Sequence, residues 1–285
     1  MDIKSRSATK GTKPSLPTEK KKLQEQKLST DEKKCIAELK KLYMETIKLD
    51  VDLQREIYNL EKSFEKKHNE IFDKRIKILE EFKNVAKGGD AKDEGQVNNF
   101  WLKVLKASYT EFISKRDEKI LVHLSDIRSK LYNEPVVKFV IEFFFEPNDY
   151  FSNRILTKTY YLNCLPDNDD PLSYDGAEIY KCEGCKIDWK QEDKEHEKKS
   201  FTTFFDFFDP PTLPDNPEDP TYADINVILQ NDFELGFYLK ERVIPKAVMF
   251  FTGEIADCLS SDSETDTDDE DAEDNDNDAT SLPTK

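Results

Sequence analysis

The sequence predicts an α+β fold, in which one very long helix precedes an antiparallel β-sheet with flanking helices. Residues 31–82 contain neither Pro nor Gly and carry apolar residues at helical spacing. Residues 136–145 then alternate in the two-residue period of a strand buried on one side. Further strand-like segments and a closing pair of helical stretches follow, and this order is typical of α+β proteins.

The first of these elements is expected to be a single helix over residues 31–86. Ser29, Thr30 and Asp31 offer an N-cap. Some fifty helical residues extend roughly 75 Å at about 1.5 Å per residue, and no single domain of this size buries an apolar stripe of that length. The members of the stripe recur mostly at steps of three, four or seven: Leu42, Leu49, Leu53, Ile57, Leu60, Phe64 and Ile71.

This stripe requires a second long helix as its partner, and a copy of the same chain is the simplest source. An intramolecular helical hairpin is the alternative, but the stretch contains no turn signal. We therefore expect a homodimer joined through residues 31–86.

Composition divides the rest of the chain. Residues 1–30 mix Lys, Ser, Thr and Pro, and predict a disordered basic arm. Residues 87–97 contain three glycines and form a linker. The aromatic-rich residues 98–254 are expected to form the α+β domain, and residues 255–285 an acidic disordered tail.

Within the folded domain, helical segments are expected from residue 99 onward, over residues 114–131, and over residues 222–230 and 233–251. The segment 114–131 is assigned as a helix because its apolar residues fit one helical face: Ile120, Leu121, Leu124, Ile127 and Leu131.

Strands are expected over residues 136–145 and 155–162, separated by a turn at Pro147. Residues 178–182 and 185–189 flank Glu183-Gly184 and predict a short hairpin.

The formal charge of −17 is unevenly distributed. Residues 1–34 carry ten basic and five acidic residues, and residues 254–285 carry thirteen acids against Lys285 alone. Residues 35–253 therefore hold a net −10, so the expected folded part is itself acidic. Such a field repels nucleic acid and anionic membranes and attracts basic proteins. We expect no sequence-specific nucleic-acid binding and no membrane association.

The sequence also indicates the cellular compartment in which the protein is expected. No apolar run reaches eighteen residues, and the N-terminal residues lack the apolar core of a secretory signal. Five cysteines in an intracellular chain are expected to be reduced thiols. We expect the protein in the nucleus and cytoplasm.

The pair Cys182-x-x-Cys185 invites a zinc or redox interpretation. Zinc needs four ligands, and the nearest candidates, Cys164 and His196, are spaced unlike a standard finger. A redox pair normally opens a helix after a strand, whereas this pair brackets a glycine turn. We expect two buried or cross-strand thiols without a metal.

No catalytic residue is assigned. None of His68, His123 and His196 has a nearby Ser or Cys in a nucleophile context, and the phosphate-binding and metalloprotease motifs are absent from the sequence. The sequence predicts a non-enzymatic protein that needs no cofactor.

Eleven of the nineteen residues from 260 to 278 are Asp or Glu. Such a segment can exchange counterions for the Lys and Arg side chains of a partner. Ser261, Ser263, Thr265 and Thr267 each precede an acid by three residues, a pattern similar to substrates of acid-directed kinases. The acids expected to bind basic partners are Asp262, Glu264, Asp266, Asp268, Asp269, Glu270 and Asp271.

Several segments together resemble the nucleosome assembly protein family. They occur in family order from about residue 39 to residue 254, and the ordered set is far more specific than any one of them. The matching segments are Ile71-Phe-Asp-Lys-Arg75, Asn99-Phe-Trp-Leu102, His123-Leu-Ser-Asp-Ile127, Glu142-Phe-Phe-Phe-Glu-Pro-Asn-Asp-Tyr-Phe151, Leu156-Thr-Lys-Thr-Tyr160, Gly184-Cys-Lys-Ile-Asp-Trp189, Phe204-Phe-Asp-Phe-Phe208 with Pro210-Pro211, and Arg242-Val-Ile-Pro-Lys246 leading to Phe251-Thr-Gly-Glu254.

The resemblance implies a dimer joined by the long helix, an "earmuff" domain whose acidic underside holds histones, and no cofactor. The implied clients are the histone 2A/2B dimer, the histone 3/4 complex and linker histone, and a paralogue could replace one subunit of the dimer. Within the folded domain, the expected histone-binding residues are Asp206, Asp209, Asp215, Glu218, Asp219, Asp224, Asp232 and Glu234.

Two departures separate this chain from the family pattern. Only eleven residues stand between Trp189 and Phe201, where the family usually carries a longer basic hairpin that often includes its nuclear import signal. The acidic tail is also shorter than in many relatives, which indicates a divergent paralogue. The alternative function is an acidic dimeric adaptor, similar to the phosphatase-inhibitor branch of the same superfamily.

Overall fold

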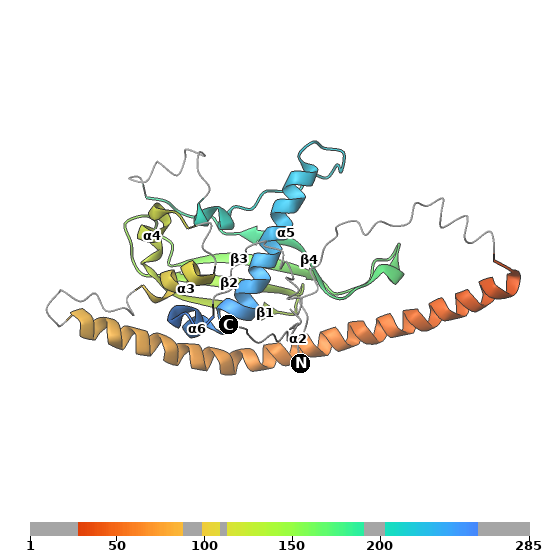
Figure 1. Cartoon of the computed structure of the whole chain (residues 1–285), viewed down its shortest axis with the longest axis horizontal. Helices are drawn as coiled ribbons and strands as arrows, with labels where there is room; N and C mark the ends of the chain where they lie inside the picture. The colour runs from red at the N-terminus through yellow and green to blue at the C-terminus, as the bar shows by residue number, and fades with distance from the viewer. Residues whose placement is uncertain (1–27, 88–98, 109–112, 191–202, 256–285) are drawn as a thin grey trace, which may run out of the picture.

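The structure is a computed structural model that describes residues 28–87, 99–108, 113–190 and 203–255 of the 285-residue chain. A 58-residue helix, α2 (Thr30–Lys87), runs along one side of an α+β domain and extends well beyond it (Figure 1). The α+β prediction is confirmed, and α2 agrees with the expected range 31–86 to within one residue at each end. Among the helices described, none is both long and apolar enough to cross a membrane.

A reciprocal cap begins α2. The backbone N–H of Ser29 donates to Oε2 of Glu32 at 2.7 Å, and the N–H of Glu32 donates to Oγ of Ser29 at 3.3 Å. These bonds satisfy two of the backbone groups that a helix start leaves without partners, and the acids in the first turn favour its positive end. With no Pro or Gly up to Phe82, the helix then continues without interruption.

The sheet has four antiparallel strands in the order β1-β2-β3-β4. The strands are β1 (Leu124–Tyr132), β2 (Lys138–Phe145), β3 (Ile155–Asn163) and β4 (Glu178–Gly184). On β2, the side chains of Phe139, Ile141, Phe143 and Phe145 are buried at alternate positions, as the period of two predicts.

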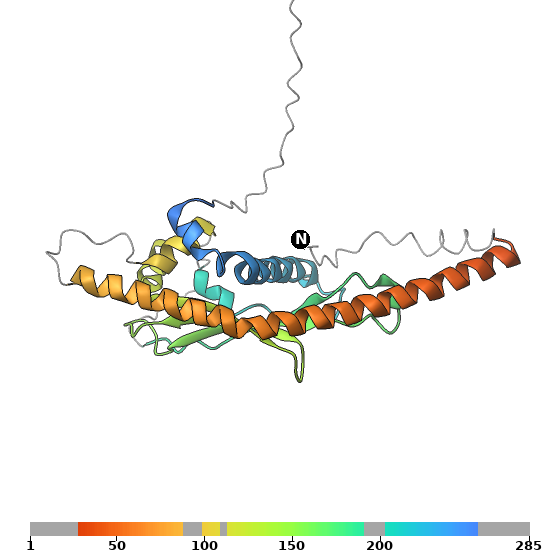
Figure 2. The same cartoon turned by 90° about the horizontal axis from the view of Figure 1, so that it is seen from below.

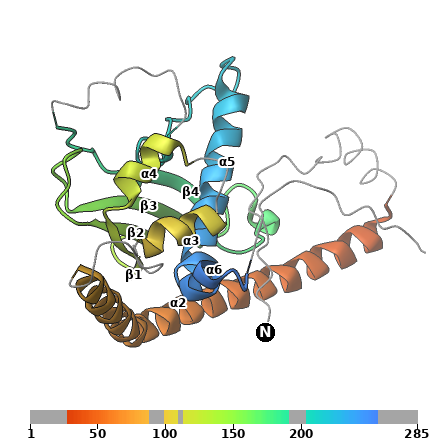
Figure 3. The same cartoon turned by 60° about the vertical axis from the view of Figure 1, so that its left-hand side comes forward.

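Helices cover one face of this sheet. They are α3 (Phe100–Ser108), α4 (Lys115–Leu121), α5 (Tyr222–Tyr238) and α6 (Ala247–Thr252), with the 3₁₀ helix η4 (Phe204–Phe208) beside them. Figure 2 shows the sheet on one side of these helices, and Figure 3 shows α3, α5 and α6 in front of it. The apolar core lies between the two layers and includes Trp101, Tyr160 and Phe250.

The expectation of a helix over residues 114–131 is wrong. Helix α4 ends at Leu121, and β1 begins at Leu124. Leu124, Ile127 and Leu131 fit a helical face in sequence, but the structure pairs Ile127 with Phe143 and Leu131 with Phe139 across the ladder. Pairing with β2 makes residues 124–132 a strand, because the short spacing of their apolar residues is compatible with either a helix or a strand.

The expected hairpin of residues 178–182 and 185–189 is also wrong. Strand β4 pairs with β3, and Trp189 instead forms an isolated bridge with Phe151. Gly184 does not make a hairpin turn. A Cβ at this position would lie 1.8 Å from the carbonyl oxygen of Phe208, so only glycine allows η4 to approach the end of β4.

The expected break near residue 231 between two C-terminal helices does not occur. Helix α5 continues to Tyr238, followed by a π-helical turn (Leu239–Val243) and α6. The helix continues because Asp232 and Gly236 both contact the sheet: Asp232 pairs with Lys158, and Gly236 lies against the ring of Tyr160.

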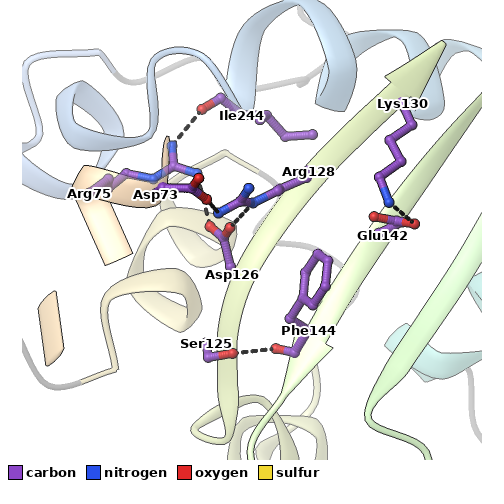
Figure 4. Close-up of polar contacts among 9 residues, drawn as sticks. All are labelled: Asp73, Arg75, Ser125, Asp126, Arg128, Lys130, Glu142, Phe144 and Ile244. Carbon is purple, nitrogen blue, oxygen red and sulfur yellow. Dashed lines mark hydrogen bonds and ion pairs between the residues drawn. The ribbon is translucent and has the colours of Figure 1, made fainter. Parts of the chain in front are cut away.

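Ion pairs attach the C-terminal half of α2 to the domain (Figure 4). Nη2 of Arg75 lies 2.9 Å from Oδ1 of Asp126 on β1, and Nη1 donates to the carbonyl oxygen of Ile244 at 3.0 Å. Arg128 joins the same cluster, with Nε 2.6 Å from Asp126 and Nη2 2.7 Å from Asp73 on α2. The Asp126 side chain is 2% exposed, so this cluster holds the long helix against the edge of the sheet.

Candidate functional site

An open groove of about 1990 Å³ lies beside β4, and we call it the β4 groove. Its walls are β4 with the connection before it, the segment 205–217, and the part of α5 from residue 222 to residue 233. Seven acidic residues line it against two lysines, Lys181 and Lys186, so the groove is suited to a cationic partner. The acids are Asp167, Asp175, Glu178, Glu183, Asp206, Asp209 and Asp215.

Aromatic packing positions the wall that contains Asp206 and Asp209. The rings of Phe204, Phe205 and Phe208 are buried in the core. Because three of the five residues of η4 are anchored in this way, the two aspartates next to them are held at the surface.

Polar contacts also fix the start of this wall. Thr203 and Asp206 form a capping box, in which the backbone N–H of Thr203 donates to Oδ2 of Asp206 at 3.0 Å. The buried carboxylate of Asp117 accepts from the hydroxyl of Thr203 and, at 3.2 Å, from the backbone N–H of Phe204. Asp206 therefore has a structural role as well as a place in the groove.

A buried ion pair attaches α5 to the sheet below the groove. Nζ of Lys158, whose side chain is fully buried, lies 2.6 Å from Oδ2 of Asp232 and donates to the carbonyl oxygen of Phe207 at 2.5 Å. The hydroxyl of Tyr160 donates to Oδ1 of Asp232 at 2.9 Å. Asp232 was expected to bind a partner at the surface. Its carboxylate is only 12% exposed and already accepts from Lys158 and Tyr160, so we no longer count Asp232 among the binding residues.

The structure distributes the other expected acids between two places. Asp206, Asp209 and Asp215 line the groove, whereas Glu218, Asp219 and Asp224 surround the start of α5 and Glu234 is exposed further along it. Hydrogen bonds from Thr221 lower the pKa of Asp219. The expected tail acids from Asp262 to Asp271, and the phosphorylation candidates Ser261, Ser263, Thr265 and Thr267, lie outside the described residues, as do most of the arm and the linker.

Sequence reasoning missed the opposite wall of the groove. Asp175 lies in the connection before β4, and Glu178 and Glu183 belong to β4 itself, within the segment expected to form a short hairpin. Ion pairing with Lys181 and a hydrogen bond from the hydroxyl of Tyr161 lower the pKa of Glu183. The acids were visible in the sequence, but only the pairing of β3 with β4 brings them into the same groove as Asp206.

The cysteines near the groove are free thiols. Burial raises the pKa of Cys182 to about 12, and nearby Asp232 adds to this effect. The backbone N–H of Thr157 donates to Sγ of Cys185 at 3.1 Å. Within the described ranges, no group of three or more His, Cys, Asp or Glu side chains is placed to hold a metal ion.

The second candidate surface is the apolar stripe of α2. Leu42, Leu49, Leu53, Leu60 and Ile71 are between 55% and 70% exposed. Phe64 is 42% exposed, and Ile57 is half-buried. Other faces of the same helix contact the domain, where the hydroxyl of Tyr58 donates to the carbonyl oxygen of Lys138 at 2.6 Å.

Together, these features define an acidic α+β protein with a long helix that exposes an apolar stripe. The chain belongs to the nucleosome assembly protein family, whose sequence model matches residues 34–254. Membership implies a histone-chaperone and nucleosome-assembly role in chromatin, carried out without catalysis.

Individual relatives agree with this assignment. The chain is 33% identical to nucleosome assembly protein 1-like 1 of Rattus norvegicus over 273 residues, covering 78% of this chain and 69% of the relative. The Homo sapiens protein of the same name is also 33% identical, with the same coverage.

Solved structures show the same fold. The nucleosome assembly protein of a malaria parasite is 27% identical, with a TM-score of 0.54, and the match covers 80% of this chain and 100% of that one. Nucleosome assembly protein 1 of Plasmodium knowlesi, also 27% identical, gives a TM-score of 0.56, with 80% and 99% covered.

Proposed function

We propose that this protein is a dimeric histone chaperone that binds the histone 2A/2B dimer through the acidic surface of its α+β domain. The observation that carries the proposal is the β4 groove, which is lined by acids from separate segments of the chain. Histones are strongly basic, and complementary charge steers such partners together and excludes acidic ones. Asp209 and Asp215 in the groove and Asp224 at the start of α5 are the principal binding residues, with the tail acids as accessories.

The exposed stripe on α2 supports the dimer. Exposed apolar surface of this extent marks an interaction site, and at about 1.5 Å per residue the helix is about 87 Å long. A second copy, or a paralogue with the same stripe, offers a surface of matching length and period. We infer residues 31–86 as the dimerisation helix, 98–254 as the histone-binding domain and 255–285 as an acidic accessory.

Further clients follow from the same chemistry. The histone 3/4 complex and linker histone carry similar basic charge, and we propose them as secondary partners in a protein that occupies both nucleus and cytoplasm. The assigned role requires no cofactor.

The deciding experiment is quantitative binding of the full chain to the histone 2A/2B dimer at physiological salt. We expect tight binding that weakens as salt is raised. Changing Asp209, Asp215 and Asp224 to Asn should weaken it, whereas changing Asp149 and Glu134, which are exposed outside the groove, should not. If the wild type binds no histone while affinity purification recovers phosphatase or cytoskeletal subunits, the adaptor function replaces the chaperone function.

A further inference from the structure

Strand β4 forms an edge of the sheet, and its edge borders the β4 groove. In the described part of the chain, β3 is the one strand hydrogen-bonded to it. Figure 1 shows β1 next to α2 and β4 at the opposite edge of the sheet. The alternation of an antiparallel ladder directs every second N–H and C=O of an edge strand away from the sheet, where another strand can bind them.

Gly184 closes one end of this edge, and no strand of the described residues other than β3 pairs with the rest of β4. The backbone of Phe208 lies directly against Gly184, so an added strand cannot extend past that point. Before it, Tyr180, Lys181 and Glu183 are exposed, with Tyr180 54% exposed. The open part of the described edge therefore lies within residues 179–183, where a register shift at Tyr180 interrupts the ladder with β3.

The groove beside this edge presents two kinds of surface. Glu178, Asp209 and Asp215 supply negative charge, whereas Tyr180 and Val227, which is 58% exposed, supply apolar contacts. An added strand projects successive side chains to opposite sides. A segment that alternates cationic and apolar residues would therefore match both surfaces at once.

We propose that the β4 groove binds an extended, lysine-rich peptide segment as an additional strand on β4. Backbone hydrogen bonds to the open edge supply sequence-tolerant affinity, and the acids of the groove select cationic side chains. The inference deepens the proposed function and rests on it: the segment would be a flexible basic part of a histone, captured separately from its folded part.

The probe for this test is a synthetic peptide of alternating lysine and valine, about eight residues long, titrated into the full chain at physiological salt. Two further peptides carry backbone N-methyl groups, one on the odd and one on the even residues. All three have the same charge and side chains. In a bound strand, the N–H groups of alternate residues point toward β4. Only one of the two methylated peptides therefore lacks the N–H groups that would face β4.

We expect the peptide methylated in that register to lose affinity by at least about tenfold, because several backbone hydrogen bonds are lost together. The other methylated peptide should bind within about twofold of the unmodified one. Hydrogen exchange should show slower exchange of the β4 amides when the unmodified peptide is bound. Changing Asp209 and Asp215 to Asn should weaken the unmodified peptide, and the matched change of Asp149 and Glu134 should not.

Equal binding of all three peptides would mean attraction by charge alone and would overturn strand addition. Strand addition would also be overturned if the unmodified peptide showed no detectable binding, or if slower hydrogen exchange appeared only in elements other than β4. A parallel titration with the histone 2A/2B dimer separates the two proposals. If the chain binds the histone dimer but the peptide does not add as a strand, only the strand-addition proposal fails. If the peptide adds as a strand but the histone dimer does not bind, the chaperone proposal fails.

Discussion

Arg75 of the long helix and Asp126 of the first strand form an ion pair with 2.9 Å between Nη2 and Oδ1, at a place where both side chains are largely buried. Arg75 also lies over the ring of Trp101, with Cζ 4.7 Å from the ring centroid, and donates to the carbonyl oxygen of Ile244. One side chain thus contacts β1, α3 and the segment before α6. Together with the pair of Arg128 and Asp73 and the hydrogen bond from Tyr58, this residue fixes the orientation of α2 relative to the acidic domain.

Changing Arg75 to Ala should lower the free energy of unfolding by about 3 kcal/mol, because it leaves the buried Asp126 with one cationic partner and opens space beside Trp101. Urea denaturation measures this loss. Changing Arg55 to Ala is the control on the same helix, since its pair with Asp52 is exposed and contributes roughly 0.5 kcal/mol or less. Equal stability of the two variants would contradict the anchoring role.

Changing both Leu53 and Leu60 to Glu should convert the dimer to a monomer, because each change places a charge where we expect a buried apolar side chain worth roughly 1.5–3 kcal/mol. Light scattering gives the mass. Changing Lys48 and Lys66 to Gln alters the net charge equally on the opposite side of the helix and should leave the mass unchanged. A double-Glu variant that keeps the dimer mass would exclude the stripe as the interface.

Changing Asp232 to Ala should lower the free energy of unfolding by about 3–5 kcal/mol, because it leaves the fully buried Lys158 without its carboxylate. Changing Asp224 to Ala, at an exposed position of the same helix, should cost about 0.5 kcal/mol or less but should reduce histone affinity. Denaturation and histone titration of both variants test this contrast. The assignment of Asp232 fails if its variant keeps wild-type stability.

Changing Gly236 to Ala should cost at least about 2 kcal/mol, although alanine normally favours a helix. The new Cβ would lie 2.2 Å from Cζ of Tyr160, so α5 would have to move off the sheet. Thermal unfolding measures the effect. Asn231 is exposed on the same helix, and its change to Ala should be neutral or stabilising. A Gly236 variant as stable as wild type would show that α5 can shift freely.

Cys182 should make stability decrease with alkaline pH. Its folded pKa of about 12 exceeds the ordinary value of 9.0, so above pH 9 the unfolded chain releases a proton that the folded chain retains. The free energy of unfolding should fall by about 1–2 kcal/mol between about pH 8 and about pH 10.5 through this group. Changing Cys182 to Ala removes that part of the pH dependence in urea titrations. Parallel curves for the two proteins would contradict a buried neutral thiol.

The long helix was accessible from sequence because its causes are local. A cap at Ser29, the absence of Pro and Gly, and apolar spacing over many turns all act within the segment. The strands β2 and β3 were also accessible, since their alternation over residues 138–145 and 155–163 is long enough to exclude a helix. The ordered motifs were specific enough to identify the family.

Tertiary structure alone decided the remainder, because the deciding contacts join residues far apart in the chain. Leu124, Ile127 and Leu131 suit a helix or a strand until β2 pairs with them. Asp232 and Asp224 are both aspartates of one acidic helix, and only the approach of Lys158 buries the first and leaves the second at the surface. The sequence by itself determined an acidic member of this family with a long striped helix. The positions of its acids relative to one another required the folded sheet.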